Sequence, residues 1–567
     1  MTAIFPYWKK YYKEILLAFF FLFAGVILDL TLPTIVSRMI DQGVMVGDMD
    51  VVLRLGLIML LVTALSAVSA IFRCIISSIV SQKFGADIRR DMFTKINKFS
   101  FETLGKQETA GLITRMTNDT SQLVAFTNSL MRIFLRAPSI LVGAIIMTLL
   151  LNVRLALILL AVVPIITLLM VISLKVTLPM FAKMQTALDK NNGVIREYLS
   201  GVRVVKAYNT FAQEVERFGD SNTDLADISI RSQRRVGIFF PIISFVVNLG
   251  LVITLWFARG WIDDSTMQVG QLVAFLNYMM QISMAIGMIF RVYQMFIRAK
   301  ASAVRVGEVL EEDVAEALGQ VEAVPAGEYD IVFDQVTFTY PGSSTPALTD
   351  ISFTLPAGEK LAIIGSTGSG KTSLVQLVPA FYKPDQGRVL VAGKDTTTVD
   401  DNRLRSQVAI SAQESTIFYG TVADNIRMGK AGATMDEITA AAKAADAYDF
   451  IAAMADGFDT VVGQRGVTLS GGQKQRISIA RALVRKAPIL VLDDSLSAVD
   501  TTTEASIMAA IDHLSPAPTT IIITQRIATV THLPYILVLD QGRVAGFGNH
   551  GQLLATCQIY QELHALQ

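Results

Sequence analysis

The chain carries the sequence Gly365-Ser366-Thr367-Gly368-Ser369-Gly370-Lys371-Thr372 near its middle. Apolar residues 361–364 come before it and helix-forming residues 373–378 follow it. This is the strand–GxxxxGK(S/T)–helix context of a phosphate-binding loop. Glycines let backbone N–H groups close around phosphates, and the helix N-terminus adds partial positive charge. We expect Lys371 to reach the β- and γ-phosphates of a nucleotide and Thr372 to hold Mg²⁺.

A second motif, Ile489-Leu490-Val491-Leu492-Asp493-Asp494, closes an apolar strand with two carboxylates. Asp493 stands where a carboxylate that orients magnesium belongs. An ATP-hydrolysing site built around this motif normally has a glutamate second, as general base, and this chain has Asp494. Gln525 stands where such sites usually have a histidine. The two departures predict a site that binds ATP but hydrolyses it poorly.

A third motif, Leu469-Ser470-Gly471-Gly472-Gln473, opens a helix that is expected to run to about Lys486 and to stop before Pro488. Ser470 is a good N-cap residue. Gly471 and Gly472 leave the helix N-terminus bare, so a phosphate can approach it. A Ser-Gly-Gly helix start alone is weak evidence for a nucleotide site, and its weight comes from the neighbouring motifs.

The first half of the chain reads as a membrane domain. Of the 567 residues, 52% are hydrophobic and 17% charged, whereas about 25% are charged in soluble domains. Six apolar runs come near the roughly 20 residues that a helix needs to cross a bilayer. We place these spans at residues 15–36, 51–80, 133–151, 155–174, 238–257 and 269–290.

Charge and composition set the remaining boundaries. Lys and Arg gather in the connections at 81–132 and 175–235, which predicts that the N-terminus and both connections are cytoplasmic. We expect a multi-pass protein of the plasma membrane whose nucleotide-binding domain is also cytoplasmic. An acidic segment follows, so we divide the chain into a membrane domain at 1–305, a linker at 306–328 and an α/β domain at 329–567.

The bulk composition argues against two further classes of protein. A zero net charge gives no reason to expect binding to nucleic acid, and Cys74 and Cys557 do not suggest a disulfide framework.

Together these motifs resemble the ATP-binding cassette (ABC) transporter family, and the order of the domains resembles an exporter half-transporter. The resemblance covers nearly the whole chain. It implies an α-helical six-span membrane domain followed by an α/β P-loop nucleotide-binding domain, with ATP and Mg²⁺ as cofactors. It also implies that Tyr340 stacks on adenine, although an aromatic residue in a strand is more often core. Gln413 is expected to contact Mg²⁺ and to sense the membrane domain.

The resemblance assigns four further segments. Residues 461–466 resemble the family's cross-linking loop, and 497–500 match the loop that crosses the dimer interface. Residues 101–120 and 201–209 look like the two coupling regions, and the second is expected to dock on the partner's nucleotide-binding domain.

In this family each ATP lies between the phosphate loop of one subunit and the LSGGQ motif of the other. The departures at Asp494 and Gln525, beside an intact LSGGQ, favour a heterodimer with a homologous but non-identical half-transporter. The partner would then supply the hydrolysing site. A homodimeric lipid or drug exporter with slow turnover stays possible at this stage, as does a regulatory subunit that binds ATP without moving cargo.

The expected cargo is hydrophobic or amphipathic and recognised loosely, as in multidrug exporters. Asp29 lies within the first span, where it can read a cationic substrate, couple to protons or simply pair with a polar neighbour. Met280, Met284 and Met288 share one face of the sixth span, which suits either an adaptable cargo surface or helix packing. Arg73 reads as a structural or snorkelling residue.

Overall fold

The computed structural model describes residues 2–264, 266–312, 330–463, 466 and 468–565. The chain divides into two compact units. The first is Met1–Asn97 with Ala110–Glu312, and the second is Lys98–Thr109 with Asp313–Gln567. The expected linker at 306–328 falls mostly outside the described residues, and its first residues continue a helix that ends at Glu311.

The first unit is helical, because a helix satisfies its own backbone hydrogen bonds in an apolar medium. In chain order its elements are η1 (Thr2–Ile4), α1 (Phe5–Lys10), α2 (Tyr12–Arg38), η2 (Met39–Val44), α3 (Met49–Asn97), α5 (Thr109–Thr114), η3 (Arg115–Asp119), α6 (Thr120–Ser129), η4 (Leu130–Phe134), α7 (Arg136–Leu151), α8 (Val153–Tyr208), α9 (Phe211–Gly237), α10 (Phe239–Asp263) and α11 (Val269–Glu311). Among the described residues, 6 helical segments are long and apolar enough to cross a membrane. The six-span architecture is therefore confirmed.

A tight hairpin joins the third and fourth spans. Only Asn152 separates α7 from α8, and its side-chain oxygen accepts a hydrogen bond from the Arg154 N–H at 2.9 Å. This bond satisfies an amide that the start of α8 leaves without a helical partner. At the other end of α8, Asn209 takes left-handed angles with φ 54° and ends the helix. Asparagine is one of the few non-glycine residues that visit this conformation routinely.

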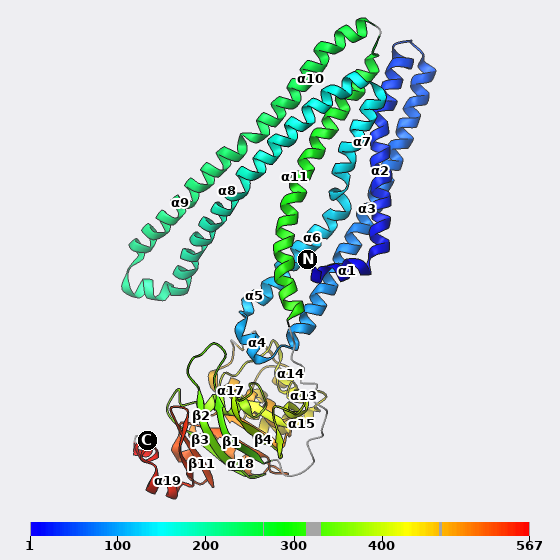
Figure 1. Ribbon diagram of the computed structural model, residues 1–567. Helices are drawn as coiled ribbons and strands as arrows, with labels where there is room; N and C mark the ends of the chain where they lie inside the picture. The colour runs from blue at the N-terminus through cyan, green and yellow to red at the C-terminus, as the bar shows by residue number, and fades with distance from the viewer. Residues whose placement is uncertain (1, 265, 313–329, 464–465, 467, 566–567) are drawn as a thin grey trace. The chain divides into compact units, whose positions relative to one another are not determined.

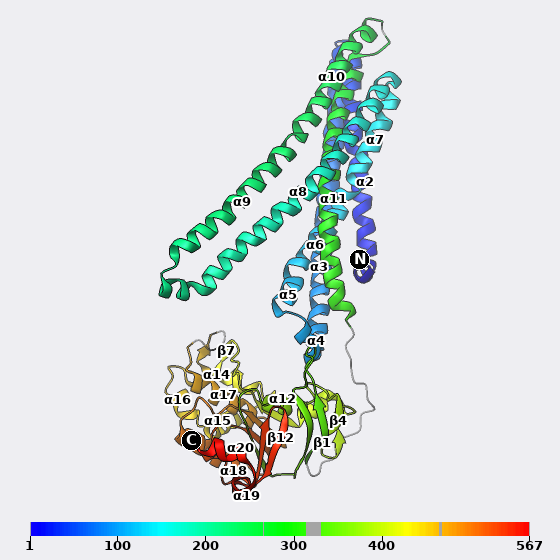
Figure 2. The same ribbon diagram turned by 60° about the vertical axis from the view of Figure 1, so that its left-hand side comes forward.

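Helices α8 and α9 continue far beyond the thickness of a bilayer. α8 has 56 residues, whereas about 20 cross the hydrocarbon core. The two helices run side by side in both views, as Figure 1 and Figure 2 show. Ion pairs join them from Arg217 to Glu197 at 2.5 Å and from Lys190 to Asp224 at 3.2 Å. This part of the hairpin is therefore polar enough to stand in water.

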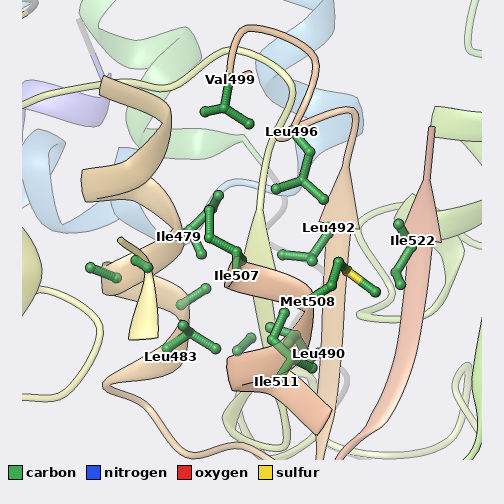
Figure 3. Close-up of a cluster of buried hydrophobic side chains, with 14 of the residues drawn as sticks. Ile479, Leu483, Leu490, Leu492, Leu496, Val499, Ile507, Met508, Ile511 and Ile522 are labelled. Carbon is green, nitrogen blue, oxygen red and sulfur yellow. The ribbon is translucent and has the colours of Figure 1, made fainter. Parts of the chain in front are cut away.

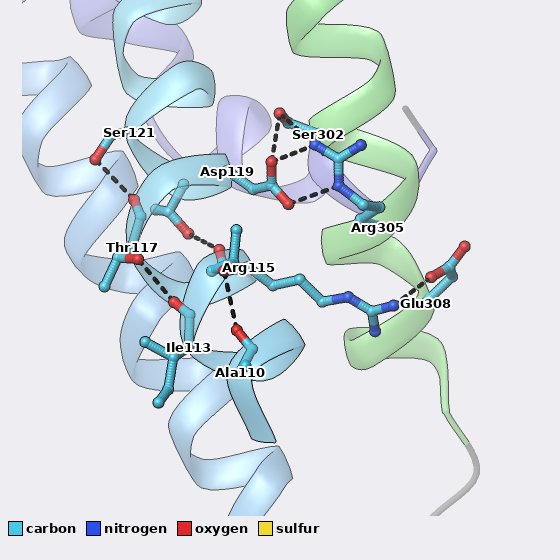
Figure 4. Close-up of polar contacts among 11 residues, drawn as sticks. Ala110, Ile113, Arg115, Thr117, Asp119, Ser121, Ser302, Arg305 and Glu308 are labelled. Atoms are coloured by element: carbon cyan, nitrogen blue, oxygen red, sulfur yellow. Dashed lines mark hydrogen bonds and ion pairs between the residues drawn. The ribbon is translucent and has the colours of Figure 1, made fainter. Parts of the chain in front are cut away.

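A polar cluster joins η3 to the last turns of α11 (Figure 4). Asp119, which is buried, accepts hydrogen bonds from the Ser302 hydroxyl and from Arg305 Nε, each at 2.8 Å. A second guanidinium nitrogen of Arg305 also binds Asp119. One turn further on, Arg115 pairs with Glu308 at 3.0 Å. These contacts fix the register between the third and sixth spans where they leave the apolar region.

The second unit mixes strands and helices, as the alternating pattern predicts. Its strands are β1 (Ile331–Phe338), β2 (Leu348–Leu355), β3 (Lys360–Ile364), β4 (Gln386–Val391), β5 (Lys394–Asp395), β6 (Val408–Ser411), β7 (Gly420–Thr421), β8 (Val461–Val462), β9 (Ile489–Asp493), β10 (Thr519–Ile523), β11 (Tyr535–Asp540) and β12 (Arg543–Gly548). Its helices are α4 (Phe101–Lys106), α12 (Lys371–Leu377), α13 (Asp401–Ser406), α14 (Val422–Arg427), α15 (Met435–Ala444), α16 (Tyr448–Ala452), η5 (Gly457–Asp459), α17 (Gly471–Leu483), α18 (Thr501–Asp512), η7 (Ile527–Thr529), α19 (His550–Thr556) and α20 (Gln558–Ala565).

The larger sheet of this unit has the strand order β12-β11-β3-β10-β9-β6. β3, β10, β9 and β6 run parallel, and every residue of β9 and β10 is buried. In such a sheet the carboxyl ends of the strands meet at one edge, where ligands bind. The loops after β3, β6, β9 and β10 therefore converge at the edge where the sequence motifs lie.

A hydrophobic core holds helix α17 against this sheet (Figure 3). Side chains from α17 and α18 pack with side chains of β9 and β10, and all of them are buried. The labelled residues are Ile479, Leu483, Leu490, Leu492, Leu496, Val499, Ile507, Met508, Ile511 and Ile522. This packing fixes the LSGGQ helix relative to the Asp493 strand.

Helix α4 belongs to the second unit although it comes between helices of the first in the sequence. Its Phe101 ring stacks on the ring of Phe381, with 4.3 Å between centroids, and also lies 6.3 Å from the Tyr382 ring. Ser100 begins the helix by accepting a hydrogen bond from the Thr103 N–H at 3.1 Å. Aromatic stacking thus holds α4, which lies in the segment expected to be the first coupling region, within the second unit.

Candidate ATP-binding site

The phosphate loop lies between β3 and α12, where the motif requires it. Gly368 and Gly370 have φ values of 85° and 99°, a conformation that glycine adopts without strain. A Cβ on Gly370 would lie 2.8 Å from a side-chain carbon of Leu348, so a larger residue does not fit. The Ser369 hydroxyl is buried and has no hydrogen-bond partner among the described residues. The loop therefore combines bare backbone with an unmatched polar group, as a phosphate cradle requires.

Lys371 is the cation of this loop. Its Nζ donates hydrogen bonds to the carbonyl oxygens of Gly365 and Ser366, each at 2.8 Å. Burial lowers the pKa of Lys371, while the Asp494 and Asp493 carboxylates act in the opposite direction. The ammonium is thus held on the loop by two backbone carbonyls, either of which a phosphate oxygen could replace.

Thr372 and Asp493 supply an oxygen pair that suits Mg²⁺. The Thr372 hydroxyl donates to an Asp493 carboxylate oxygen at 3.2 Å. Hydroxyl and carboxylate oxygens are the hard ligands that Mg²⁺ prefers, together with water and the substrate's phosphates. When bound, the ion would neutralise charge on the β- and γ-phosphates. No cluster of three or more His, Cys, Asp or Glu side chains that could hold a metal occurs in the described part of the chain.

The neighbouring carboxylates are held in a poorly solvated place. Burial raises the pKa of Asp493, and the nearby Asp494 carboxylate acts in the same direction, while Thr372 and Lys371 oppose it. Burial also raises the pKa of Asp494, while the positive charges of Lys371 and Arg526 act in the opposite direction. Both carboxyl groups therefore accept a proton more readily than an ordinary aspartate does.

The backbone of Asp494 has left-handed angles, with φ 46°. Its N–H donates to the carbonyl of Ile523 on β10 at 3.1 Å, which holds this residue at the end of the sheet. Aspartate tolerates left-handed angles better than most residues. The end of the strand thus fixes the position of the Asp494 backbone, and the short side chain limits how far its carboxylate extends from the sheet.

Gln525 follows β10 at the same edge and is exposed. The next residue, Arg526, donates to the buried carboxylate of Glu504 at 2.7 Å and to the carbonyl of Val499 at 3.3 Å. These bonds tie the loop after β10 to the 497–500 loop. Sequence reasoning did not identify Glu504, because a glutamate inside a helix gives no signal of burial.

Tyr340 lies beside the helix that follows the phosphate loop. Its hydroxyl is 3.0 Å from Ser373 Oγ and 3.1 Å from Gln376 Oε1, both on α12. Its ring meets the Tyr382 ring edge-on, with 5.2 Å between centroids. The ring is only partly buried against the core, so adenine stacking stays a prediction.

The LSGGQ helix begins with a complete capping box. Ser470 Oγ accepts from the Gln473 N–H at 3.3 Å, and Gln473 Oε1 accepts from the Ser470 N–H at 2.9 Å. Gly471 and Gly472 follow the cap, so no Cβ shields the N–H groups of the first turn.

Two other parts of the site are predicted from the family resemblance. Of the expected cross-linking loop at 461–466, Gln464 and Arg465 lie outside the described residues. Gln413 is exposed in the loop after β6.

A buried glutamine that sequence reasoning missed links this helix to the 497–500 loop. Gln475 Oε1 accepts from the Ala498 N–H at 3.0 Å, and Gln475 Nε2 donates to the Ser497 hydroxyl at 3.4 Å. Gln475 is buried in α17. The spacing to Gln473 gave no hint of this role, which depends on a contact 23 residues away in sequence.

In the membrane unit, some of the candidate transport residues come together. A cavity of about 360 Å³ is lined by Asp29, Met284 and Met288, among other residues. Met280 is 57% exposed and does not line this cavity. Asp29 accepts hydrogen bonds from Ser66 Oγ at 2.6 Å and from Arg136 at 2.9 Å. The aspartate is therefore already paired within the chain.

Two family descriptions match the chain. The ABC transporter transmembrane region matches residues 15–286, and the ABC transporter description matches residues 348–497.

The chain also resembles curated proteins and solved structures along most of its length. It is 38% identical over 540 residues to the uncharacterised ABC transporter ATP-binding protein YfiB of Bacillus subtilis, covering 95% of this chain and 94% of that protein. It is 32% identical over 567 residues to an ATP-dependent lipid A-core flippase of Thiobacillus denitrificans, covering 99% and 96%. A bacterial Atm1-family ABC exporter with ATP bound has a similar structure, with a TM-score of 0.83, 28% identity and coverage of 98% and 99%.

Proposed function

This chain belongs to the ABC transporter family as an exporter half-transporter, and we propose that it is the weakly hydrolysing subunit of a heterodimeric exporter. A half-transporter implies pairing with a second half. In the proposed dimer, this chain binds Mg²⁺·ATP at its own phosphate loop and lends its LSGGQ helix to the partner's site. The cargo is a hydrophobic or amphipathic compound that leaves the cell by alternating access.

The observation that carries this proposal is the contrast between two parts of one site. The contacts of Lys371 with the phosphate loop and of Thr372 with Asp493 support binding of a nucleotide and its metal. Asp494 is one methylene shorter than a glutamate, and a displacement near 1 Å can lower the rate by roughly a hundredfold. Gln525 can donate a hydrogen bond but cannot exchange a proton at neutral pH. The LSGGQ motif itself is intact, with Ser470, Gly471 and Gly472 at the start of α17, and an intact motif supports a role in the partner's hydrolysing site.

Membrane placement follows from charge. Lysines and arginines concentrate in the connections at 81–132 and 175–235, which favours a cytoplasmic position for both connections, the N-terminus and the nucleotide-binding domain. The relatives that are described as a flippase and as an exporter support outward movement of cargo.

ATPase assays of the purified chain test the proposal. The full chain is reconstituted in lipid nanodiscs alone and together with a candidate partner, taken as a half-transporter with Glu and His at the positions of Asp494 and Gln525. We expect the chain alone to hydrolyse ATP at least tenfold more slowly than the pair. Brisk hydrolysis by the isolated chain would refute the heterodimer and favour a homodimeric exporter.

A transport assay separates an exporter from a regulator. Inverted vesicles that contain the pair should accumulate a fluorescent amphipathic dye when ATP is added, and vesicles with ADP should not. ATP hydrolysis without accumulation of dyes of either charge would favour a regulatory subunit.

A further inference from the structure

The membrane unit contains a positively charged cavity that nucleotide binding does not use. Its volume is about 610 Å³, and no Asp or Glu is among the residues that line it. Four of its lining residues are arginines from three different spans. They are Arg73 of α3, Arg132 and Arg136 of the third span, and Arg291 of α11.

One acidic side chain partly compensates this charge. Asp29 lines two adjoining cavities that share Arg136 with the first, and it forms an ion pair with Arg136 at 2.9 Å. The group of four arginines and one aspartate therefore has a formal excess of three positive charges. No ion pair to Arg73, Arg132 or Arg291 is found within the described ranges, so the excess has no protein counter-charge there.

Arg73 is the arginine of this group whose burial argues most directly for a ligand. It is 9% exposed, and its Nε has no hydrogen-bond partner among the residues that the structure describes. A buried guanidinium nitrogen without a hydrogen-bond partner is costly, and ionisable groups inside a membrane domain usually mark a ligand path. The sequence interpretation of Arg73 as a structural or snorkelling residue did not anticipate this burial. Arg73 is therefore a buried cation for which the described residues supply no anionic partner within ion-pair distance.

The depth of these groups indicates how a ligand would lie. Arg73 is about 36 Å along α3 from Met49, and Arg291 about 33 Å along α11 from Val269, at 1.5 Å per residue. Because the hydrocarbon core is about 30 Å thick, these guanidinium groups lie near one headgroup level. Asp29 is nearer the middle of its span, about 22 Å from Val44.

The wall beside Asp29 is mostly apolar. The cavity that holds Asp29 is also lined by Leu32, Val36, Ile140, Met284 and Met288. Charge at a headgroup level and an adaptable apolar surface next to it match a molecule with one anionic end and one hydrocarbon end.

We propose that this cavity binds the anionic headgroup of an amphipathic cargo, with Arg73 and Arg132 as its direct ligands. Asp29 acts as a positioning residue, which holds Arg136 away from the anion and limits the positive charge. The inference rests on the proposed export function and narrows its cargo to phosphate-, sulfonate- or carboxylate-bearing amphiphiles. It replaces a direct role of Asp29 in reading a cation.

Equilibrium binding of matched probes to the purified full chain in nanodiscs tests the proposal without ATP. The probes are radiolabelled dodecyl phosphate, dodecyltrimethylammonium and inorganic phosphate. We expect dodecyl phosphate to bind at least tenfold more tightly than either of the others, because the site needs both charge and chain. Equal binding of inorganic phosphate would assign the site to a free anion, and preferred binding of the cation would overturn the proposal.

Substitutions then locate the site. Arg73→Gln and Arg132→Gln should each weaken dodecyl phosphate binding about tenfold or more, and Arg73→Lys should restore most of it. The matched control is Arg54→Gln, an exposed arginine on the same helix as Arg73, which should bind like the unaltered chain. Should Arg73→Gln fail to fold, Arg132→Gln, whose side chain is only half-buried, decides the question. Unchanged binding in a folded Arg132→Gln chain would overturn the assignment.

Asp29→Asn gives an effect of opposite sign. Removing this carboxylate releases Arg136 and raises the excess charge, so dodecyl phosphate should bind more tightly. Weaker binding of dodecyltrimethylammonium with no gain for the phosphate would instead support a cation-reading Asp29. Because these measurements need neither partner nor hydrolysis, they can fail while the export function stands, and a loss of ATP-driven transport leaves them unaffected.

Discussion

Arg305 and Asp119 form a two-pronged ion pair, in which two guanidinium nitrogens donate to the two carboxylate oxygens. Asp119 is 1% exposed, and the Ser302 hydroxyl gives it a third hydrogen bond. The pair connects the third and sixth spans, which are far apart in sequence. A fully buried carboxylate with all its partners on one helix makes that helix difficult to displace.

We predict that Arg305→Gln destabilises the membrane unit by about 2–3 kcal/mol, because it leaves the Asp119 charge buried and poorly compensated. The value lies below the roughly 3–5 kcal/mol expected for a fully buried pair, since the Arg305 side chain is 47% exposed. Thermal unfolding in detergent measures it. Arg217→Gln, which breaks the exposed pair with Glu197, should lower the unfolding temperature much less, because solvent screens an exposed ion pair. Equal losses in both variants would contradict the role given to Asp119.

The double substitution Asp494→Glu with Gln525→His should raise ATP hydrolysis by the chain alone at least tenfold. It restores the reach of the carboxylate and a proton-exchanging group, and the chain's own LSGGQ can complete the site in a homodimer. ATPase rates at saturating ATP measure this. If the ATPase rate does not rise although nucleotide binding is intact, features other than these two residues limit hydrolysis at this site.

In the complex with its partner, Asp494→Asn should lower ATPase activity only modestly. The equivalent change of the partner's catalytic glutamate should abolish it, because the two sites differ in chemistry. Steady-state ATPase rates of the two single variants, prepared side by side, decide the matter. Equal loss from both changes would count against the asymmetric scheme.

Binding of Mg²⁺·ATP should weaken on acidification at a higher pH than an ordinary aspartate would give. Burial raises the pKa of Asp493, so the carboxylate that holds the metal takes up its proton earlier as the pH falls. The free chain should not lose stability over the same range, since the ionised form is the one that folding disfavours. Titration with a fluorescent ATP analogue, with Mg²⁺ or with EDTA, measures the effect. In Asp493→Asn the metal-dependent part should be small at every pH.

Gln475→Leu should destabilise the nucleotide-binding unit by about 1–3 kcal/mol, because it leaves the Ala498 N–H without its acceptor. It should also lower the ATPase activity of the pair, since the LSGGQ helix loses its link to the 497–500 loop. Denaturant unfolding of the chain and ATPase assays of the complex measure the two effects. Gln473→Leu, at the exposed cap, is the comparison and should cost less stability.

Periodicity and motif order were enough for the spans and for the nucleotide-binding fold. The apolar run at 15–36 lies within α2, and the run at 133–151 begins in η4 and continues through α7, because burial of backbone in lipid leaves few alternatives to a helix. Helix ends were less predictable. α8 continues to Tyr208, since a polar sequence can stay helical after it leaves the apolar layer. The π-helical η3 and η4 give no compositional signal at all.

Contacts between distant segments are what the sequence could not supply. Asp29 gave a signal by being charged within a span, but its partner Arg136 is 107 residues away. Gln475 is a second example, because its hydrogen-bond partners belong to the 497–500 loop, which is distant in sequence. The phosphate loop was predictable because its glycines, lysine and threonine act through local backbone geometry.

The stacking of Phe101 on Phe381 has a practical consequence for work with fragments. A truncated protein that starts near residue 330 would lack α4 and present Phe381 and Tyr382 to water. Bare aromatic rings on a soluble fragment promote self-association. Such fragments should aggregate at the concentrations that crystallisation or NMR requires, and adding a peptide of residues 98–109 should reduce this aggregation.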